Sequence, residues 1–247
     1  MDKILIDQFK RDGFLHLKRY ISEKSIFDIN AAFKSSLKKE NSTDSIFEDI
    51  LSVEKDNHEK VYNAQKIVGS SFAFSKLLSE VRPDKIHTDI YGGKQTNINL
   101  VPLQLPVQFP DDERFDFKWH QECGSYKFRL LTFWFPTIGE VNEKNGSMAV
   151  IPSSHKDGER ESHYVKKESG LNDWRVFLNS NDMDPIVIKA VPGDLIIFDD
   201  KLIHSSQPNS SNLPRQVGIF RSFDITNMPE VKPIFQEVNF LDDTFEK

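Results

Sequence analysis

The N-terminal third of the chain has the spacing of amphipathic helices. Apolar side chains recur every three or four positions in three stretches, which predicts helices over residues 3–12, 22–39 and 61–81. Gly13 suits the left-handed position that follows a helix end, and Ser22 suits the N-cap of the second helix. The short apolar run at residues 14–17 predicts a strand between these two helices.

Two further features complete this helical part. Residues 40–60 are polar and acidic around a small apolar island that includes Phe47, which predicts a mobile segment holding a short helix. Pro83 is expected to end the helical region, because proline disrupts a helix interior.

From about residue 86 the pattern changes to short β-rich runs separated by turn signals such as Asn145-Gly146 and Pro192-Gly193-Asp194. The runs predict strands over residues 98–101, 103–109, 128–135, 147–151, 186–191, 195–198 and 216–223. Many short strands at such spacing indicate an all-β sandwich or barrel. The order of the elements is therefore helices first and a β core second.

Residues 156–184 interrupt the series of strands with a long polar stretch. A loop of this length in a compact domain is usually functional, often a lid. There is no internal repeat and no clean linker, so we expect one domain over residues 1–247, with a helical part at about 1–85 and a β core at about 86–225.

Charge and composition exclude several classes of protein. The net charge of −6 argues against a nucleic-acid partner, whose binding surface needs a basic stripe. The longest nearly apolar run, residues 130–135, is too short to span a membrane, and acidic residues near the start argue against a signal peptide. The single Cys123 excludes an intramolecular disulfide and any multi-cysteine metal site. We expect a cytoplasmic protein with no membrane partner and leave its oligomeric state open.

Three His-x-Asp/Glu pairs are candidate metal ligands: His87/Asp89, His120/Glu122 and His155/Asp157. On a strand, both side chains of such a pair lie on one face, as two ligands of one metal require. With 7 His and 38 acidic residues, about one pair is expected by chance, so context must separate them. The third pair lies in a turn, whereas either of the others fits the end or the edge of a strand.

The pair His120/Glu122 ranks first, because it follows an alternating aromatic and polar stretch and precedes the run 128–135. The pair His87/Asp89 remains its rival. A third ligand would come from another strand, and His204 ends the apolar segment that begins at Gly193. Taken alone, each of these histidines is also compatible with a structural role.

Three motifs appear in order and resemble the phytanoyl-CoA dioxygenase family of Fe(II)/2-oxoglutarate oxygenases. They are Trp119-His120-Gln121-Glu122, the stretch from Asn145 to Lys156, and a tail containing Pro192-Gly193-Asp194, His204-Ser205-Ser206, Asn209 and Arg215. The opening Phe9-x-x-Asp12-Gly13-Phe14 is also similar to that family, so the resemblance extends from about residue 8 to 222.

The resemblance implies a mainly β fold, a double-stranded β-helix (a cupin-like jelly roll) with N-terminal α-helices. It implies His120, Glu122 and His204 as catalytic iron ligands and favours this set over His87/Asp89. The implied cofactors are Fe(II), the cosubstrate 2-oxoglutarate and O2, and the implied reaction hydroxylates an unactivated C–H bond of a small-molecule substrate. Two imidazoles and one carboxylate on one face of an octahedral iron leave three positions for the cosubstrate and O2.

Four further residues are expected to bind the cosubstrate. Arg215, 11 positions after His204, can offer a bidentate fork to the far carboxylate of 2-oxoglutarate. Ser206 lies on the same strand face as His204 and can donate to that carboxylate. The family pattern places Trp134 in the cosubstrate pocket, and Gln104 is a candidate polar contact from an earlier strand.

One departure from the family pattern leaves two alternatives. Most members have Asp where this chain has Glu122, whose carboxylate reaches one methylene further. The alternatives are a non-catalytic jelly-roll binding protein with a vestigial metal site, and a hydrolase or isomerase with a His/His/Glu zinc site. Residues expected near the mouth of the site suit an anionic or carbohydrate-like substrate, namely Phe47, Tyr126, Lys127, Arg129, His163, Tyr164, Trp174 and Arg175.

Overall fold

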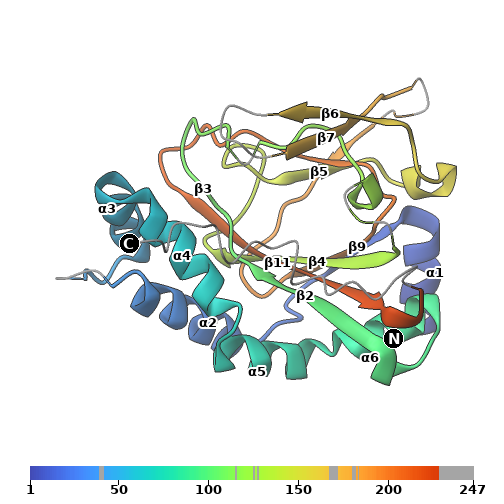
Figure 1. Cartoon of the computed structure of the whole chain (residues 1–247), viewed down its shortest axis with the longest axis horizontal. Coiled ribbons are helices and arrows are strands. Elements are labelled where there is room, and N and C mark those ends of the chain that lie inside the picture. The colour runs from blue at the N-terminus through green and yellow to red at the C-terminus, as the bar shows by residue number, and fades with distance from the viewer. Residues whose placement is uncertain are drawn as a thin grey trace, which may run out of the picture.

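In the computed structural model, the N-terminal helices lie along one face of an antiparallel sheet (Figure 1). The structure describes residues 1–38, 42–114, 116–124, 126, 128–166, 172–179, 182 and 184–227. Its helices are α1 (Lys3–Asp12), α2 (Glu23–Ser36), α3 (Ile46–Asp56), α4 (His58–Val68), α5 (Phe72–Val81) and α6 (Pro83–Tyr91). Four short 3₁₀ helices follow, η1 (Gln95–Asn97), η2 (Glu122–Gly124), η3 (Ser154–Asp157) and η4 (Ile225–Asn227). None of the helices described is long and apolar enough to cross a membrane.

Gly13 and Ser22 have the positions at helix ends that the sequence predicts. The side chain of Asp2 accepts a hydrogen bond from the backbone N–H of Ile4 and so caps α1. Gly13 ends α1 with φ of +82°, where a side chain would be strained, and its N–H donates to the carbonyl of Phe9. Ser22 caps α2, which ends a few residues earlier than expected. These predictions are confirmed, as is the strand β1 (Phe14–Leu17).

The prediction for residues 40–60 is wrong in part. Outside the undescribed residues 39–41, this segment contains all of α3 and the start of α4, so it is mostly helical. Asn57 separates the two helices and caps α4 with its side chain. Pro83 begins α6 rather than closing a helical region, because proline is well tolerated in a first helical turn, where its missing N–H has no partner to lose.

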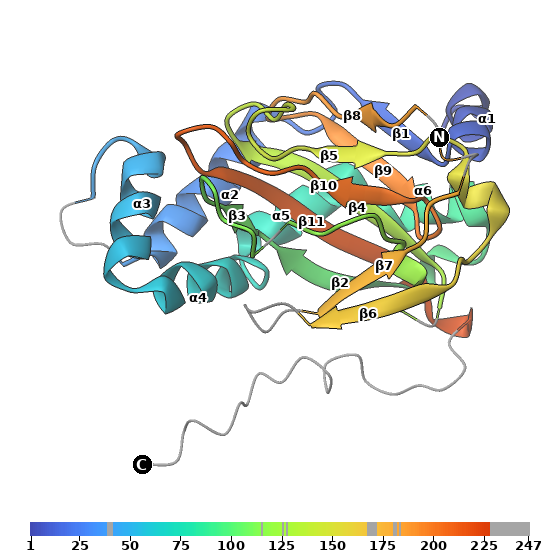
Figure 2. The same ribbon diagram turned by 90° about the horizontal axis from the view of Figure 1, so that it is seen from above.

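The strands form two antiparallel sheets and a separate hairpin. The larger sheet has the order β1-β9-β4-β11-β2, with β3 also paired to β11, and the smaller sheet has the order β10-β5-β8. Their bounds are β2 (Ile98–Gln104), β3 (Val107–Gln108), β4 (Leu130–Ile138), β5 (Met148–Val150), β8 (Ile186–Val187), β9 (Leu195–Asp199), β10 (His204–Ser206) and β11 (Arg215–Asp224). The hairpin joins β6 (Ser162–Lys166) to β7 (Asn172–Val176) within the stretch that was expected to be a loop (Figure 2). Figure 1 shows this hairpin on the far side of the larger sheet from helices α2–α5.

The central strand β4 is buried at every position, because the larger sheet is covered on both faces. Its residues Leu131, Phe133 and Phe135 belong to the apolar core that includes the buried faces of the helices. Trp134, on the opposite face, packs in a second core with apolar residues of the smaller sheet. The two sheets therefore pack against each other through an apolar core. The ring of Phe198 in that core contacts His204, one of the candidate ligands.

A glycine allows β4 and β11 to pack this closely. Gly218 faces Phe135 in the register of the two strands. A Cβ at Gly218 would approach the Phe135 ring to 2.2 Å, well inside van der Waals contact. Only a residue without a side chain fits here, which fixes the centre of the strand that carries Arg215.

Candidate metal centre

His120 and His204 face each other across an isolated backbone bridge. The N–H of His120 donates to the carbonyl of His204 over 2.9 Å, and the reverse hydrogen bond measures 3.0 Å. The two rings lie with their centroids 4.1 Å apart. His204 starts β10, which pairs with β5, so the smaller sheet holds one histidine and the bridge positions the other.

Both imidazoles are oriented through the nitrogen that a metal would not use. Nδ1 of His120 lies 2.7 Å from the carbonyl oxygen of Lys118, and Nδ1 of His204 lies 2.9 Å from that of Leu202. A carbonyl only accepts hydrogen bonds, so each Nδ1 carries a proton and Nε2 is the ring nitrogen that remains for a metal. Burial, aided by the neighbouring His120, lowers the pKa of His204 to about 3, so this ring is neutral at physiological pH.

Glu122 lies in the same place but not on a strand. It begins the 3₁₀ helix η2, so the expectation that strand alternation aligns it with His120 is wrong. Its Oε1 is 3.9 Å from Nε2 of His204 and 2.7 Å from Nη2 of Arg221. Burial alone would raise the pKa of this carboxyl group, but the charge and hydrogen bond of Arg221, together with the neighbouring His204 and His120, outweigh that effect and the pKa falls to about 2. Glu122 is therefore a buried carboxylate.

The donor set fits a divalent iron in type, with two imidazole nitrogens and one carboxylate. Within the described part of the chain, however, no three His, Cys, Asp or Glu side chains are already arranged to hold a metal. Ligand atoms in neighbouring octahedral positions lie roughly 3 Å apart, so the Glu122 carboxylate has to approach His204 by about 1 Å. Its ion pair with Arg221 holds it at the longer distance.

Arg215 is a second buried cation, at the start of β11. Its Nη2 donates to the side-chain oxygen of Gln108, whereas its Nε is buried without a partner. Among the residues that the structure describes, no carboxylate forms an ion pair with it, and burial lowers its pKa to about 10. A buried guanidinium without a counter-ion is costly unless an anion neutralises it.

The other three expected cosubstrate residues have different surroundings. Ser206 ends β10, two residues after His204, and is half-buried. Trp134 is buried in the core between the two sheets. Gln104 is exposed at the end of β2, where its side-chain oxygen accepts a 3.4 Å hydrogen bond from Arg221 rather than from Arg215. Gln108, which the sequence reasoning missed, is the residue that contacts Arg215.

The two rival pairs lie elsewhere in the fold. His87 and Asp89 belong to α6, so the expectation of a strand end is wrong for them. His87 is buried against Ser222 with a 2.8 Å hydrogen bond, and Asp89 pairs with Lys85. His155 and Asp157 form part of η3, where His155 contacts the carbonyl of Lys10. None of these four residues is placed with His120, Glu122 or His204.

The hairpin β6–β7 lies beside the segment that carries the first ligands. The N–H of Val176 donates to the carbonyl of Trp119 over 2.9 Å, and Gly124 lies against Ser162 and Trp174. Of the expected lid, residues 167–171, 180, 181 and 183 lie outside the described residues, as does Lys127.

Several residues expected at the mouth have other partners. Arg129 forms an ion pair with Asp199 and lies 4.0 Å over the ring of Tyr91. Phe47 packs against the core beneath the helices. Four other residues expected at the mouth lie on the β6–β7 hairpin, namely His163, Tyr164, Trp174 and Arg175.

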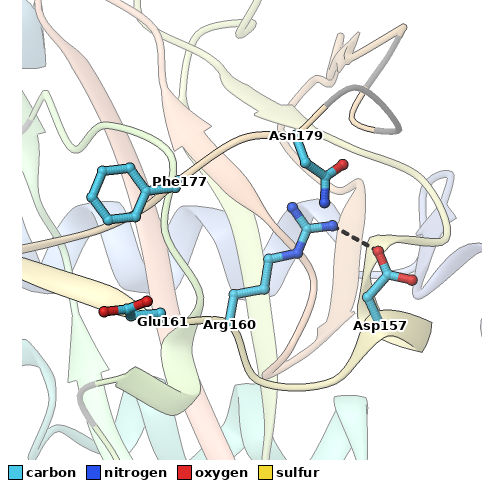
Figure 3. A pocket seen from close by; sticks show the side chains of 5 residues that line it. All are labelled: Asp157, Arg160, Glu161, Phe177 and Asn179. Carbon is cyan, nitrogen blue, oxygen red and sulfur yellow. Dashed lines mark hydrogen bonds and ion pairs between the residues drawn. The ribbon is translucent and has the colours of Figure 1, made fainter.

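A surface pocket of about 470 Å³ lies where β6 begins and β7 ends, and neither His120 nor His204 lines it. Figure 3 shows Arg160 in this pocket with its guanidinium toward Asp157. Arg160 also pairs with Asp182, so its charge is already neutralised. The pocket contains none of the candidate ligands.

Comparison with known proteins supports the fold inferred from these contacts. The ectoine dioxygenase of Sphingopyxis alaskensis is 26% identical over 222 residues, which cover 84% of this chain and 71% of that enzyme. Two solved structures share the fold. EvdO2 of Micromonospora carbonacea var. aurantiaca has a TM-score of 0.65 at 16% identity, covering 94% of this chain and 95% of that one. The alpha-ketoglutarate-dependent epimerase SnoN from nogalamycin biosynthesis has a TM-score of 0.60 at 15% identity, covering 90% and 82%. The predicted jelly roll with N-terminal helices is confirmed.

The sequence also matches the family model described as Phytanoyl-CoA dioxygenase (PhyH) over residues 9–217, most of the chain. This range contains all three candidate ligands and Arg215, and it agrees with the range of the resemblance seen in the sequence motifs. The chain belongs to the phytanoyl-CoA dioxygenase family.

Proposed function

We propose that this chain hydroxylates an unactivated C–H bond of a small molecule, using Fe(II), O2 and 2-oxoglutarate, which is converted to succinate and CO2. Its membership of a dioxygenase family gives the class of enzyme and these cofactors. The observation that carries the assignment to named residues is the facing pair His120 and His204, each with its Nδ1 held by a backbone carbonyl, beside the buried carboxylate of Glu122.

His120, His204 and Glu122 would hold the metal. The two backbone carbonyls behind the imidazoles hold a proton on each Nδ1 and orient the rings, so that Nε2 would be the nitrogen that binds the metal. When bound, iron activates O2 for oxidation of the substrate at the expense of 2-oxoglutarate. Residues of the apolar core between the sheets, Trp134 among them, limit the access of water to this chemistry.

Arg215 would bind the far carboxylate of 2-oxoglutarate. Its guanidinium is buried, and Nε has no partner in the described residues, so it can accept a dianionic cosubstrate without first losing an ion pair. Gln108 holds one end of the guanidinium and thereby orients the fork. Ser206, on the strand of His204, is proposed as a second donor to the same carboxylate.

A non-catalytic binding protein is not favoured. Such a protein has no use for a buried cation like Arg215, and the chain belongs to a family of dioxygenases. The reaction outcome is a separate question, because a structural neighbour with the same fold is described as an epimerase. We favour hydroxylation, and the substrate is a small molecule, as the name of the related ectoine dioxygenase indicates for that enzyme.

The test is turnover of 2-oxoglutarate. Purified protein is loaded with Fe(II), supplied with O2 and 2-oxoglutarate, and screened against small molecules by succinate release, with mass spectrometry of the products. We expect succinate formation that needs iron, rises with a matching substrate and accompanies a product heavier by one oxygen atom. Iron-independent turnover, or equal turnover by His204→Ala, would contradict the assignment. A product of unchanged mass would replace hydroxylation by another oxidative outcome.

A further inference from the structure

Arg221 is a buried arginine that the proposed reaction does not yet use. It lies on β11 six residues after Arg215, and the intervening Val217 and Ile219 of the same strand face belong to the core between the sheets. Its side chain is 10% exposed. Its guanidinium donates two hydrogen bonds to oxygen atoms among the described residues. Nη2 donates to Oε1 of Glu122, and Nη1 donates weakly to Oε1 of Gln104.

The contact with Glu122 competes with metal binding. Oε1 of Glu122 is the atom that Arg221 holds at 2.7 Å, and it is also the atom that lies 3.9 Å from Nε2 of His204. If His204 and Glu122 held a metal, the carboxylate would share its negative charge with that metal. Arg221 would then keep only part of its counter-ion.

Of the two N–H donors along one edge of the Arg221 guanidinium, only one has a partner. The Nε–H and an Nη2–H of arginine point the same way and match the two oxygens of a planar carboxylate. Glu122 accepts from Nη2, whereas Nε of Arg221 is buried without a partner. A second carboxylate could occupy both donors, which Glu122 does not do.

The charges around a loaded centre lead to the same conclusion. With Fe(II) bound, its two positive charges would be offset by Glu122 and by one carboxylate of 2-oxoglutarate. Arg215 would offset the second, far carboxylate of 2-oxoglutarate. Arg221 remains as a buried cation in a site of low polarity, where an unpaired charge is costly.

We propose that Arg221 is a specificity-determining residue that anchors a carboxylate of the substrate. This inference rests on the proposed function, since it presupposes that Glu122 binds iron and that Arg215 binds 2-oxoglutarate. Glu122 and the substrate carboxylate alternate as partners of Arg221, so that the substrate binds well only after the metal has engaged Glu122. The exposed Gln104 and the nearby ring of Tyr126, 5.5 Å from the guanidinium, mark the side from which the substrate approaches.

The test measures binding without turnover. Protein is loaded with Mn(II), which does not support the oxidation, and with saturating 2-oxoglutarate under argon. Binding of acetate, hexanoate and benzoate is then compared by calorimetry with binding of their neutral amides. We expect at least one carboxylate to bind about tenfold or more tightly than its amide, the difference that a charge-assisted bidentate contact supplies. The preference should disappear when Mn(II) is omitted, because Glu122 then keeps Arg221.

Two variants and one control complete the design. Arg221→Met should lose the preference for carboxylates while still binding Mn(II) and 2-oxoglutarate. Arg221→Lys, which keeps the charge that Glu122 needs for folding, should retain only part of the preference. Arg82→Met removes a surface guanidinium paired with Asp84 and should change nothing.

The outcomes separate this inference from the proposed function. If wild-type protein fails to bind Mn(II) or 2-oxoglutarate, both fall. If it binds both but shows no preference for any carboxylate, or if Arg221→Lys keeps the full preference with and without metal, only the role of Arg221 is overturned. Loss of 2-oxoglutarate binding in Arg221→Met would also overturn it, by assigning Arg221 to the cosubstrate.

Discussion

The imidazoles of His120 and His204 are held together by the backbone. Each residue donates its N–H to the carbonyl of the other, and the ring centroids lie 4.1 Å apart as a result. Their relative position is therefore set by strand pairing, and one side chain can be removed without moving the other. This separation makes substitutions at the site interpretable.

Replacement of a histidine ligand should abolish metal binding and leave the fold in place. We expect His204→Ala to weaken binding of Mn(II) by roughly a hundredfold or more, since changes even in residues behind a ligand commonly cost 10–100-fold. Calorimetry measures the affinity, and circular dichroism checks the fold. His58→Ala, at a half-exposed histidine on α4, is the matched control. Unchanged affinity in His204→Ala would remove this residue from the ligand set.

Replacement of Arg215 should affect the cosubstrate and not the metal. A hydrogen bond to a charged group contributes about 1.5–3 kcal/mol, so we expect Arg215→Met to weaken binding of 2-oxoglutarate by about 10- to 100-fold. Arg215→Lys should fall between, because it keeps the charge and loses the fork. Titration of each Mn(II)-loaded variant with 2-oxoglutarate gives its affinity for the cosubstrate, and a separate titration of the metal-free variant gives its affinity for Mn(II). An equal loss of Mn(II) affinity would point to a general disruption of the site instead.

The ligand set could be anticipated from sequence only through family resemblance. Spacing alone left His87/Asp89 and His120/Glu122 as rivals, since a strand or a helix can carry either motif. The structure places the first pair on α6, and it places Glu122 in a 3₁₀ turn rather than on a strand. Strand alternation therefore does not explain the position of Glu122, although its carboxylate lies 3.9 Å from His204.

Arg221 and the β6–β7 hairpin were missed for different reasons. Ser162–Lys166 is a polar stretch whose strand character comes from pairing with β7, a contact between segments that local pattern does not reveal. Arg221 lies within the largely apolar run from Val217 to Phe223, and a charged residue in such a run is the sequence feature that could have drawn attention to it. A charged residue within a buried strand needs a partner, but sequence alone does not say that the partner is Glu122.

The close packing of Gly218 on Phe135 gives a prediction about stability. A methyl group at Gly218 meets the Phe135 ring at 2.2 Å. We expect Gly218→Ala to lower the free energy of unfolding by about 1–3 kcal/mol, the usual cost of overpacking. Addition of Phe135→Leu should recover part of this loss, because the smaller side chain makes room. Denaturant unfolding of the single and double variants measures the coupling, and strictly additive effects would contradict the proposed contact.

Two buried carboxyl groups next to the His204 segment should make stability depend on pH. Burial, together with the charge of Asp199, raises the pKa of Asp200 to about 7. In the unfolded chain Asp200 loses its proton near pH 4, so between about pH 4 and 7 the folded state binds more protons and stability falls as pH rises. Burial alone would raise the pKa of Asp199, but hydrogen bonds from Asp200 and from the backbone N–H of Lys201, with the charge of Arg129, hold it below the ordinary value, so Asp199 contributes the opposite trend at acidic pH.

Asp200→Asn isolates this effect, because the amide resembles the protonated acid. Relative to wild type, we expect the variant to gain stability as the pH rises from 5 to about 7 and the difference to level off above that, as measured by chemical unfolding at each pH. Asp184→Asn, at an exposed aspartate, serves as the control and should show no such trend. Parallel curves for wild type and Asp200→Asn over this range would mean that Asp200 is ionised in the folded protein.

We propose that one site on this chain chelates iron and 2-oxoglutarate together. The most direct measurement adds Fe(II) to the metal-free protein without oxygen, then 2-oxoglutarate, and records the weak visible charge-transfer band of an iron-chelated keto acid. We predict that the band appears in wild type, is lost in His204→Ala, and is lost in Arg215→Met at limiting 2-oxoglutarate. Tight metal binding with no band at any concentration of 2-oxoglutarate would contradict the account and favour a zinc-type or non-catalytic site.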